Sequence, residues 1–255
     1  MPPAPDPTQR FSNRVEDYVR HRPGYPPELV ATLEREAGLG PSSVVADLGS
    51  GTGISAELFL DAAATVFAVE PNSAMRRAAE ARLSGRPGFV SVDGTAEATG
   101  LAEASVDLVT AGQAFHWFDR GPARREMARI LTGGGRVALF WNTRLVEETP
   151  FLRGYEELLL TFGTDYRRVD HRRVDHEALA AFFGGPFATR SFPNRQLFDL
   201  EGLKGRLLSC SYVPAASDPR HEPMLEALAR LFAEHEEAGR MSMLYETELH
   251  FGPLA

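Results

Sequence analysis

The chain has 255 residues, of which 43% are apolar and 24% charged, so it can bury a sizeable core as one domain or as one domain with an elaboration. Its formal net charge of −8 argues against non-specific binding to nucleic acid or to an anionic membrane. A single cysteine, Cys210, excludes an internal disulfide framework and a cysteine-based zinc site, and without a run of 18 apolar residues we expect no membrane span.

The N-terminal residues show no targeting pattern. Residues 1–7 are proline-rich and polar and lack the basic-then-apolar order of a signal peptide, so we expect a cytoplasmic protein. Residues 1–10 are expected to be disordered. Residues 11–18 are expected to form at most a short amphipathic helix before a turn-rich segment at residues 22–27.

Strand and helix patterns alternate five times up to residue 145. The expected strands are at 43–48, 65–69, 88–92, 106–111 and 136–142. The expected helices are at 26–37, closed by Gly38 or Gly40, at 54–60, from Asn72 or Ser73 to 83, and at 122–131. A glycine turn at 133–135 precedes the last of these strands. This alternation is typical of a doubly wound parallel sheet. Right-handed crossovers then place the carboxyl ends of its first and fourth strands side by side, where a ligand crevice forms.

The second half of the chain is less regular. Its expected elements are helices at 151–162 and 177–183, a strand at 188–198, helices at 200–209 and 222–238, and a final strand at 241–251. The extra helices are expected to roof the active site, with mere coverage of the sheet face as the alternative. The charge-dense segment at 166–176 is expected to be solvated, or else to bind an acidic substrate. His171 and His176 lack a supporting carboxylate pattern, so no metal site is expected.

The most informative motif spans residues 44–53, where an apolar run is followed by three glycines at alternate positions. Glycines let a backbone approach a ligand closely, and the helix that follows offers free N–H groups. The dinucleotide pattern Gly-x-Gly-x-x-Gly fails because its sixth position is Ile54. Asp47, before the first glycine, suits a positively charged ligand. It also suits two structural roles, capping the helix at Ile54 or holding the glycine turn.

At these residues the chain resembles the class I S-adenosylmethionine-dependent methyltransferases, whose first motif reads Asp-Leu-Gly-x-Gly-x-Gly. The resemblance implies a seven-stranded, mostly parallel, Rossmann-like α/β sheet with an antiparallel last strand. It also implies S-adenosylmethionine as the cofactor and S-adenosylhomocysteine as the product. We expect one domain over 1–255, with an N-terminal cap at 11–37, a cofactor-binding core at 38–145 and a substrate side at 146–255. The motif residues expected to bind the cofactor are Asp47, Gly49, Ser50, Gly51 and Gly53.

Two later segments complete the expected cofactor site. Glu70 ends the second strand 17 residues after Gly53, where a carboxylate can accept hydrogen bonds from vicinal ribose hydroxyls, and Pro71 follows it. A surface glutamate that caps the next helix is the alternative. By the resemblance, Thr95 and Ala96 lie against the adenine, although Thr95 stands where similar enzymes carry an acid. A shifted register gives that role to Asp93.

The end of the fourth strand is expected to face both ligands. Ala111 and Gly112 are small enough to bring a backbone carbonyl near the cofactor's ammonium group, and Met75 either lies near the adenine or is a core residue. The run Gln-Ala-Phe-His-Trp-Phe-Asp resembles a small-molecule branch that includes trans-aconitate methyltransferases. Its His116 is the candidate catalytic residue, as a base, as a donor that orients the substrate, or only as a packed side chain. Trp117 lines the pocket or fills the core.

Aromatic and basic residues near the N-terminus also resemble this branch. Tyr18 and Arg22 are expected to bind the cofactor, the arginine through the carboxylate, and Tyr25 to bind the substrate. The alternative is a simple N-terminal strap. Asp119 is expected to cap the helix at 122–131.

The predicted function is methyl transfer by direct displacement to a small molecule, and the resemblance suggests that the acceptor bears a carboxylate. Two alternatives are a methyltransferase acting on protein or nucleic acid and a protein that binds S-adenosylmethionine without catalysis. Residues 111–114 read Ala-Gly-Gln-Ala and lack the Asn-Pro-Pro-Tyr-like motif of many base-methylating relatives. We expect no nucleic-acid partner and no membrane partner, and leave the oligomeric state open.

Overall fold

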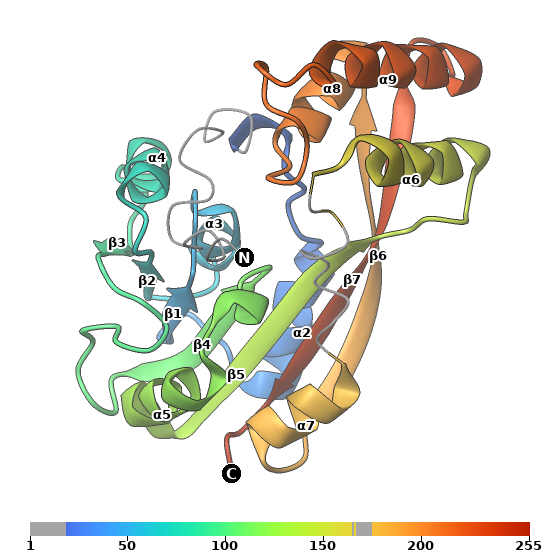
Figure 1. Cartoon of the computed structure of the whole chain (residues 1–255). Helices are drawn as coiled ribbons and strands as arrows, with labels where there is room; N and C mark the ends of the chain where they lie inside the picture. The colour runs from blue at the N-terminus through green and yellow to red at the C-terminus, as the bar shows by residue number, and fades with distance from the viewer. Residues whose placement is uncertain (1–18, 165, 167–174) are drawn as a thin grey trace.

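The alternating patterns of the first half fold into a parallel sheet, as the sequence predicts. The computed structural model describes residues 19–164, 166 and 175–255 (Figure 1). Residues 1–18, with the expected disordered end and Tyr18, and most of the segment at 166–176 lie outside the described residues. The parallel strands are β1 (Val44–Leu48), β2 (Thr65–Val69), β3 (Phe89–Val92), β4 (Val106–Gly112) and β5 (Leu131–Arg144).

Two further strands complete the sheet, and of these only the final strand of the chain runs against the direction of the five parallel strands. The final strand β7 (Met241–Gly252) pairs antiparallel with β5, and β6 (Ala188–Phe198) pairs antiparallel with β7 at the sheet edge. The strand order is therefore β3-β2-β1-β4-β5-β7-β6. The predicted seven-stranded, Rossmann-like methyltransferase fold is confirmed.

Capping residues lie at the end of α2 and at the start of α4, where the sequence predicts them. Gly38 closes α2 (Pro27–Ala37) with a φ of 77°, in the left-handed region that glycine adopts without strain. The Asn72 side chain accepts hydrogen bonds from the N–H groups of Ala74 and Met75 at the start of α4 (Ser73–Leu83). The short helix α3 (Ile54–Phe59) begins directly after the glycine motif.

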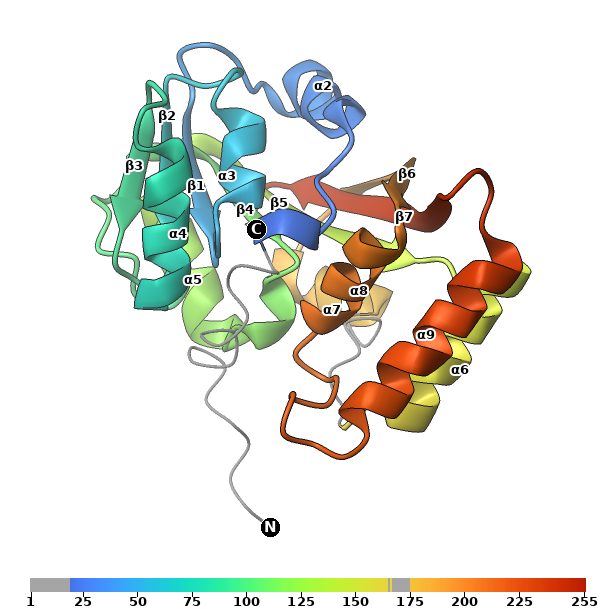
Figure 2. The ribbon, with the colours of Figure 1, turned by 90° about the horizontal axis from the view of Figure 1, so that it is seen from above.

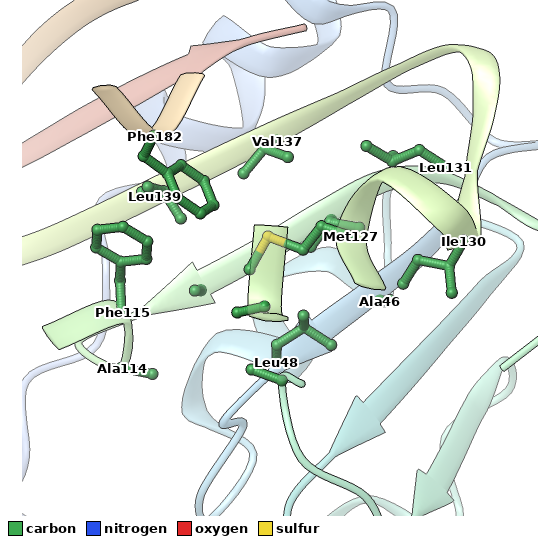
Figure 3. Packing of buried hydrophobic residues seen from close by; sticks show 14 of the residues in the cluster. Ala46, Leu48, Ala114, Phe115, Met127, Ile130, Leu131, Val137, Leu139 and Phe182 are labelled. Atoms are coloured by element: carbon green, nitrogen blue, oxygen red, sulfur yellow. The ribbon is translucent and has the colours of Figure 1, made fainter. Parts of the chain in front are cut away.

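Helices cover both faces of the parallel sheet. One apolar cluster joins α2, α3 and the end of α4 to one face, through residues such as Leu29, Phe59 and Leu83. The opposite face is covered by α5 (Arg120–Ile130) and α7 (His176–Phe183), and Figure 3 shows Met127 and Phe182 packed over it. The helix α7 is thus a cover of the sheet and not part of a roof, which corrects the expectation for that helix.

The remaining helices form a separate layer beyond the carboxyl ends of the parallel strands. They are α6 (Pro150–Phe162), α8 (Leu200–Leu208) and α9 (His221–His235). The helices α6 and α9 lie side by side, and α8 lies between them and the parallel sheet (Figures 1 and 2). Their apolar faces pack against the carboxyl end of β6 and the start of β7. These helices roof the crevice end of the sheet, as expected.

A few boundaries differ from the prediction. Strand β5 begins at Leu131, which pairs with Val106, and resumes pairing at Arg136 opposite Leu108, so the glycines at 133–135 form an irregularity inside the strand. Helix α9 ends at His235, before the expected position 238. Within the described residues, no helix is long and apolar enough to cross a membrane.

Candidate functional site

A cavity of about 450 Å³ lies at the carboxyl ends of the parallel strands, under the roof helices. Its wall combines the loops after β1, β2, β3 and β4 with the N-terminal segment, the end of β5, α8 and β7. The predicted site residues that line it are Arg22, Tyr25, Gly49, Ser50, Gly51, Glu70, Pro71, Thr95, Ala96, His116 and Trp117. Asp47, Gly53 and Ala111 do not line it.

The glycine loop is fixed by backbone hydrogen bonds and close packing. The N–H groups of Gly49 and Ser50 both donate to the Val69 carbonyl, at 2.9 and 3.2 Å, which ties the loop after β1 to the end of β2. Gly49 has a φ of 67°, and a Cβ there would lie 2.7 Å from the Cβ of Ala114. These glycines are therefore required by the turn itself, and no L side chain fits at Gly49 without a shift.

Gly53 lies outside the cavity lining and packs against α4. A Cβ at this position would lie 2.6 Å from Leu83 Cδ1 and 3.2 Å from the Ala79 Cβ, both on α4. Its φ is 81°, again left-handed. Gly53 thus lets α4 approach the start of α3, and it acts on the cavity through packing.

Asp47 lies beneath the loop and is fully buried. Its Oδ2 accepts a hydrogen bond from Ser55 Oγ at 2.6 Å and its Oδ1 accepts one from Thr110 Oγ1 at 2.9 Å. Burial raises the pKa of Asp47 to about 7, although these hydroxyls and the Ala56 N–H favour the charged form. The structure places Asp47 as a brace between β1, β4 and the first turn of α3, the structural alternative that the sequence left open.

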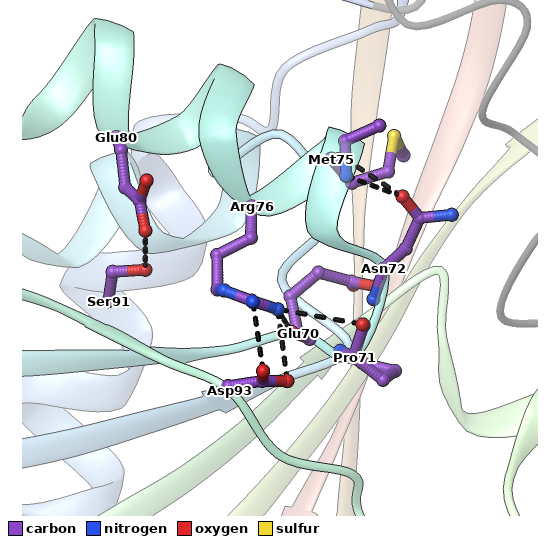
Figure 4. A network of polar contacts seen from close by, with 9 residues as sticks. Glu70, Pro71, Asn72, Met75, Arg76, Glu80, Ser91 and Asp93 are labelled. Carbon is purple, nitrogen blue, oxygen red and sulfur yellow. Dashed lines mark hydrogen bonds and ion pairs between the residues drawn. The ribbon is translucent and has the colours of Figure 1, made fainter.

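Glu70 stands at the wall of the cavity, and both of its carboxylate oxygens are held by backbone. Oε2 accepts from the Gly51 N–H at 2.9 Å and Oε1 accepts from the Asn72 N–H at 2.8 Å. Figure 4 shows the Glu70 side chain beside Asn72. Burial raises its pKa, and the two N–H donors oppose that shift. The capping interpretation of Glu70 is wrong, because the Asn72 side chain caps α4.

Of the two residues offered for the adenine side, Thr95 lines the cavity and Asp93 does not. Asp93 is exposed, outside the cavity, and paired with Arg76 through contacts of 3.0 and 2.9 Å (Figure 4). Thr95 Oγ1 accepts from the Ala98 N–H at 3.2 Å, and Thr95 and Ala96 both line the cavity. Met75 also lines the cavity although it is only 4% exposed. It is therefore both a core residue and a residue of the cavity wall.

The loop after β4 contains a strained residue that the sequence did not single out. Gln113 has a φ of 55°, which is uncommon for a residue with a side chain. Its N–H donates to the Phe140 carbonyl at 2.9 Å, and its Oε1 is buried with no hydrogen-bond partner among the described residues. Gly112 beside it has no room for a Cβ, which would lie 2.8 Å from the Tyr25 hydroxyl. Backbone strain and an orphaned acceptor together mark this loop as functional.

His116 and Trp117 lie in the short 3₁₀ helix η1 (Phe115–Trp117), with ring centroids 4.7 Å apart, and both line the cavity. Asp119 occupies the N-cap position of α5, but its side chain makes no capping hydrogen bond. Its backbone N–H donates instead to Glu97 Oε1 at 2.9 Å. The expected cap is therefore wrong as a side-chain interaction.

The N-terminal segment lines the cavity and is attached both to the sheet and to the end of α8. The Gly24 carbonyl accepts from Asn142 Nδ2 at 3.0 Å and from Asn194 Nδ2 at 2.9 Å, and Arg22 donates to the Ser209 carbonyl at 3.1 Å. The Tyr25 ring meets Phe140 edge-on, with centroids 4.7 Å apart. Arg22 and Tyr25 both line the cavity. The segment is thus attached to the rest of the protein and also forms part of the cavity wall, so both alternatives from the sequence apply to it.

The far wall contains polar residues that the sequence reasoning missed. They come from the end of β5, from position 166, from α8 with the loop after it, and from β7. The members of this acceptor wall are Arg144, Tyr166, Arg206, Ser211, Tyr212 and Tyr245. No group of three or more acidic, histidine or cysteine side chains able to hold a metal ion lies in the described part of the chain.

Comparison with known proteins shows which family part of the chain is similar to. Residues 46–139 match the family model of the methyltransferase domain. Over these residues the chain is similar to methyltransferases. An uncharacterized methyltransferase of Mycobacterium tuberculosis is 41% identical over 134 residues, which cover 52% of this chain and 52% of that relative. The chain thus aligns with about half the length of the curated relatives that it matches in this way.

Two further relatives extend the comparison. The malonyl-[acyl-carrier protein] O-methyltransferase of Methylococcus capsulatus is 38% identical over 122 residues, covering 43% of this chain and 44% of that protein. The solved structure of a candidate type II methyltransferase from Anaeromyxobacter dehalogenans is 25% identical and superposes with a TM-score of 0.67. It covers 91% of this chain and 98% of that one. The second likeness includes the roof helices as well as the methyltransferase domain.

Proposed function

We propose that this chain is an S-adenosylmethionine-dependent methyltransferase that transfers a methyl group to a small-molecule acceptor by direct displacement. Glu70 carries this proposal. Its carboxylate faces the cavity, and each oxygen accepts one backbone N–H bond. A carboxylate oxygen has room for a second donor, so Glu70 is held in position to accept from two vicinal ribose hydroxyls.

The groups around the glycine loop fit such a cofactor. The hydroxyls of Ser50 and Thr52 are buried and have no hydrogen-bond partner among the described residues, and both residues line the cavity. Buried polar groups without partners are rare in folded proteins and mark places where a ligand or water binds. The orphaned Gln113 Oε1 adds an acceptor for the cofactor's ammonium group.

Other residues that line the cavity support the remaining cofactor contacts. Thr95 and the Ala96 N–H would meet the adenine, and Arg22 would meet the carboxylate of the methionine part. A backbone carbonyl at Gly112, which lines the cavity, would serve the ammonium better than one at Ala111, which does not. Asp47 supports these contacts from beneath by holding the glycine loop.

When bound, S-adenosylmethionine supplies an electrophilic methyl group on a sulfonium, and the chain's own task is to align an acceptor with it. Alignment of two reactants contributes about 7–11 kcal/mol to such reactions. His116 would take the proton from an acceptor that carries one at neutral pH, whereas a carboxylate acceptor needs no base.

The relative from Methylococcus capsulatus, named as an O-methyltransferase of malonyl-[acyl-carrier protein], supports a carboxylate oxygen as the methyl-accepting atom. Because that alignment covers less than half of either chain, the acceptor assignment remains our proposal. The net charge of −8 disfavours nucleic acid as the acceptor.

The test is calorimetric titration with S-adenosylmethionine, S-adenosylhomocysteine and NAD, followed by a search for S-adenosylhomocysteine release with a mixture of small acceptors. We expect both adenosyl compounds to bind, NAD not to bind, and turnover with at least one acceptor. Binding of NAD, or of neither adenosyl compound, would falsify the proposal. Tight binding without turnover across a broad acceptor panel would favour the non-catalytic alternative.

A further inference from the structure

The acceptor wall contains a buried cation, Arg206, that has no acidic partner among the residues that the structure describes. Arg206 lies in the last turn of α8, is only 6% exposed, and lines the cavity. Its Nε donates to the Tyr245 hydroxyl at 3.2 Å and its Nη1 donates to Cys210 Sγ at 3.0 Å. No carboxylate within the described residues pairs with it. A guanidinium has five N–H donors, so three remain after these two bonds.

Arg144, on the same wall, provides the contrast. Its guanidinium pairs with Glu156, donates to the Tyr166 hydroxyl at 3.2 Å and lies over the Tyr155 ring at 5.0 Å. The charge of Arg144 is therefore balanced within the protein. Its Nη1 is nevertheless buried without a hydrogen-bond partner among the described residues, which leaves a second donor at this end of the cavity.

Burying a guanidinium without a counter-charge is unfavourable, and Arg stays protonated at any ordinary pH. The carboxyl end of α8 supplies a partial negative charge equivalent to about half an elementary charge. Burial works to raise the pKa of the Cys210 thiol, but the charges of Arg206 and Arg22 outweigh it and lower that pKa to about 7. Near neutral pH a large share of the molecules therefore present Arg206 beside a neutral thiol.

We infer that Arg206 binds a carboxylate of the methyl acceptor, with Arg144 Nη1 as a second donor, in the part of the cavity opposite the glycine loop. This inference rests on the proposed function and specifies the acceptor class. A single negative charge balances Arg206, because Arg144 is already paired with Glu156. A phosphate dianion would leave an extra buried negative charge, so the charge balance favours a carboxylate.

The test compares carboxylates with their neutral amides on protein saturated with S-adenosylhomocysteine. Acetate is titrated against acetamide and benzoate against benzamide by calorimetry. We expect each carboxylate to bind at least about tenfold more tightly than its amide, the scale of a buried charge-assisted hydrogen bond. Arg206→Met should abolish this preference, and Arg206→Lys should restore part of it. Arg230→Met is the matched control, because Arg230 is an exposed arginine outside the cavity.

Cys210 supplies a second readout, because the chain has no other cysteine. An anion beside Arg206 would oppose the thiolate, so acetate should reduce the thiolate absorbance near neutral pH and acetamide should not. Cys210→Ser removes the signal and identifies its source. An arginine with a purely structural role predicts no such change.

The outcomes separate this inference from the function on which it rests. Protein that binds S-adenosylhomocysteine but shows no carboxylate preference, or keeps that preference in Arg206→Met, overturns the inference and leaves the proposed function standing. Inorganic phosphate that binds more tightly than acetate overturns the carboxylate assignment. Failure of S-adenosylhomocysteine to bind overturns the proposed function and this inference with it. Unchanged affinity for S-adenosylhomocysteine in Arg206→Met shows that the variant is folded.

Discussion

The two ends of the cavity are built by different means. The end proposed for the cofactor consists of loops at 49–51, 70–72, 95–97 and 112–117, each beginning at or within three residues of the end of a strand. The acceptor wall consists of side chains from Arg144 to Tyr245, on elements far apart in the sequence. A glycine loop tolerates little change at its glycines. A wall of side chains can change the ligand that it binds by single substitutions.

The largest effect on stability is expected from a substitution at Gly49, in the glycine loop of the cavity. A Cβ there would meet Ala114 at 2.7 Å, and the φ of 67° is unfavourable for alanine. We expect Gly49→Ala to lower the free energy of unfolding by about 3 kcal/mol, from overpacking and left-handed strain together. Chemical denaturation measures this loss. Gly40→Ala is the control, since a Cβ at Gly40 would meet nothing within 4 Å. Equal stability of the two variants would show that the loop is not a rigid cradle.

The brace beneath the loop predicts a pH dependence. The folded-state pKa of Asp47 is raised from 3.8 to about 7, so the folded protein holds this proton more tightly than the unfolded chain does. Stability from this group is therefore present below the unfolded pKa and is lost as the pH rises through the folded one. Between about pH 5 and about pH 8, wild type should lose about 2–3 kcal/mol relative to Asp47→Asn.

Urea denaturation of both proteins at the two pH values measures this difference, and groups common to both cancel. Asp61→Asn is the control, because Asp61 has an exposed carboxylate. If wild type and Asp47→Asn lose stability in parallel, Asp47 is not the buried titrating group that its surroundings indicate.

Glu70 tests whether the cofactor end recognises ribose. Glu70→Ala should weaken the affinity for S-adenosylhomocysteine by about 1.5–3 kcal/mol, the scale of charge-assisted hydrogen bonds. It also leaves the Gly51 and Asn72 N–H groups without their acceptor, so Glu70→Gln separates loop support from charge. Calorimetry on folded variants measures the affinity, with Glu28→Gln on the exposed start of α2 as control. Unchanged affinity in Glu70→Ala would show that Glu70 does not bind ribose.

His116 lines the cavity from the short helix after β4, and its substitution should have the smallest effect in free energy. We expect His116→Ala to lower turnover about tenfold or more, while the affinity for S-adenosylhomocysteine changes less than about twofold. Turnover is followed as S-adenosylhomocysteine release with an acceptor found in the screen. His235→Ala, at the end of α9 and outside the cavity, is the control. Full activity in His116→Ala would reduce His116 to a packing role.

Sequence reasoning was most accurate where local chemistry decides the structure. The turn at Gly38, the cap at Asn72 and the position of Glu70 at the end of β2 all follow from residues only a few positions apart. It was less accurate where the same local pattern serves several purposes. Gly49 and Gly53 belong to one motif, yet only Gly49 lines the cavity and Gly53 packs against α4.

The acceptor wall could not be predicted in this way. Arg206 sits in an amphipathic stretch that reads like any surface helix, and its burial depends on how α8 packs against β7 and the loop at Cys210. Arg144 likewise extends a strand whose end is covered only when α6 packs over it. Nothing in their immediate neighbours distinguishes these arginines from exposed ones.

The order of strands and helices, the glycine turn and the acid at the end of β2 were determined by the sequence alone, because backbone conformation depends on neighbouring residues. The tertiary structure alone decided that Arg22, Arg144 and Arg206 line one cavity and that Asp47 braces the glycine loop from below. It also decided that α7 covers the sheet. Those relations join residues that are distant along the chain. They arise only when apolar faces pack against one another, and that packing determines which charges become buried and which of them need a partner.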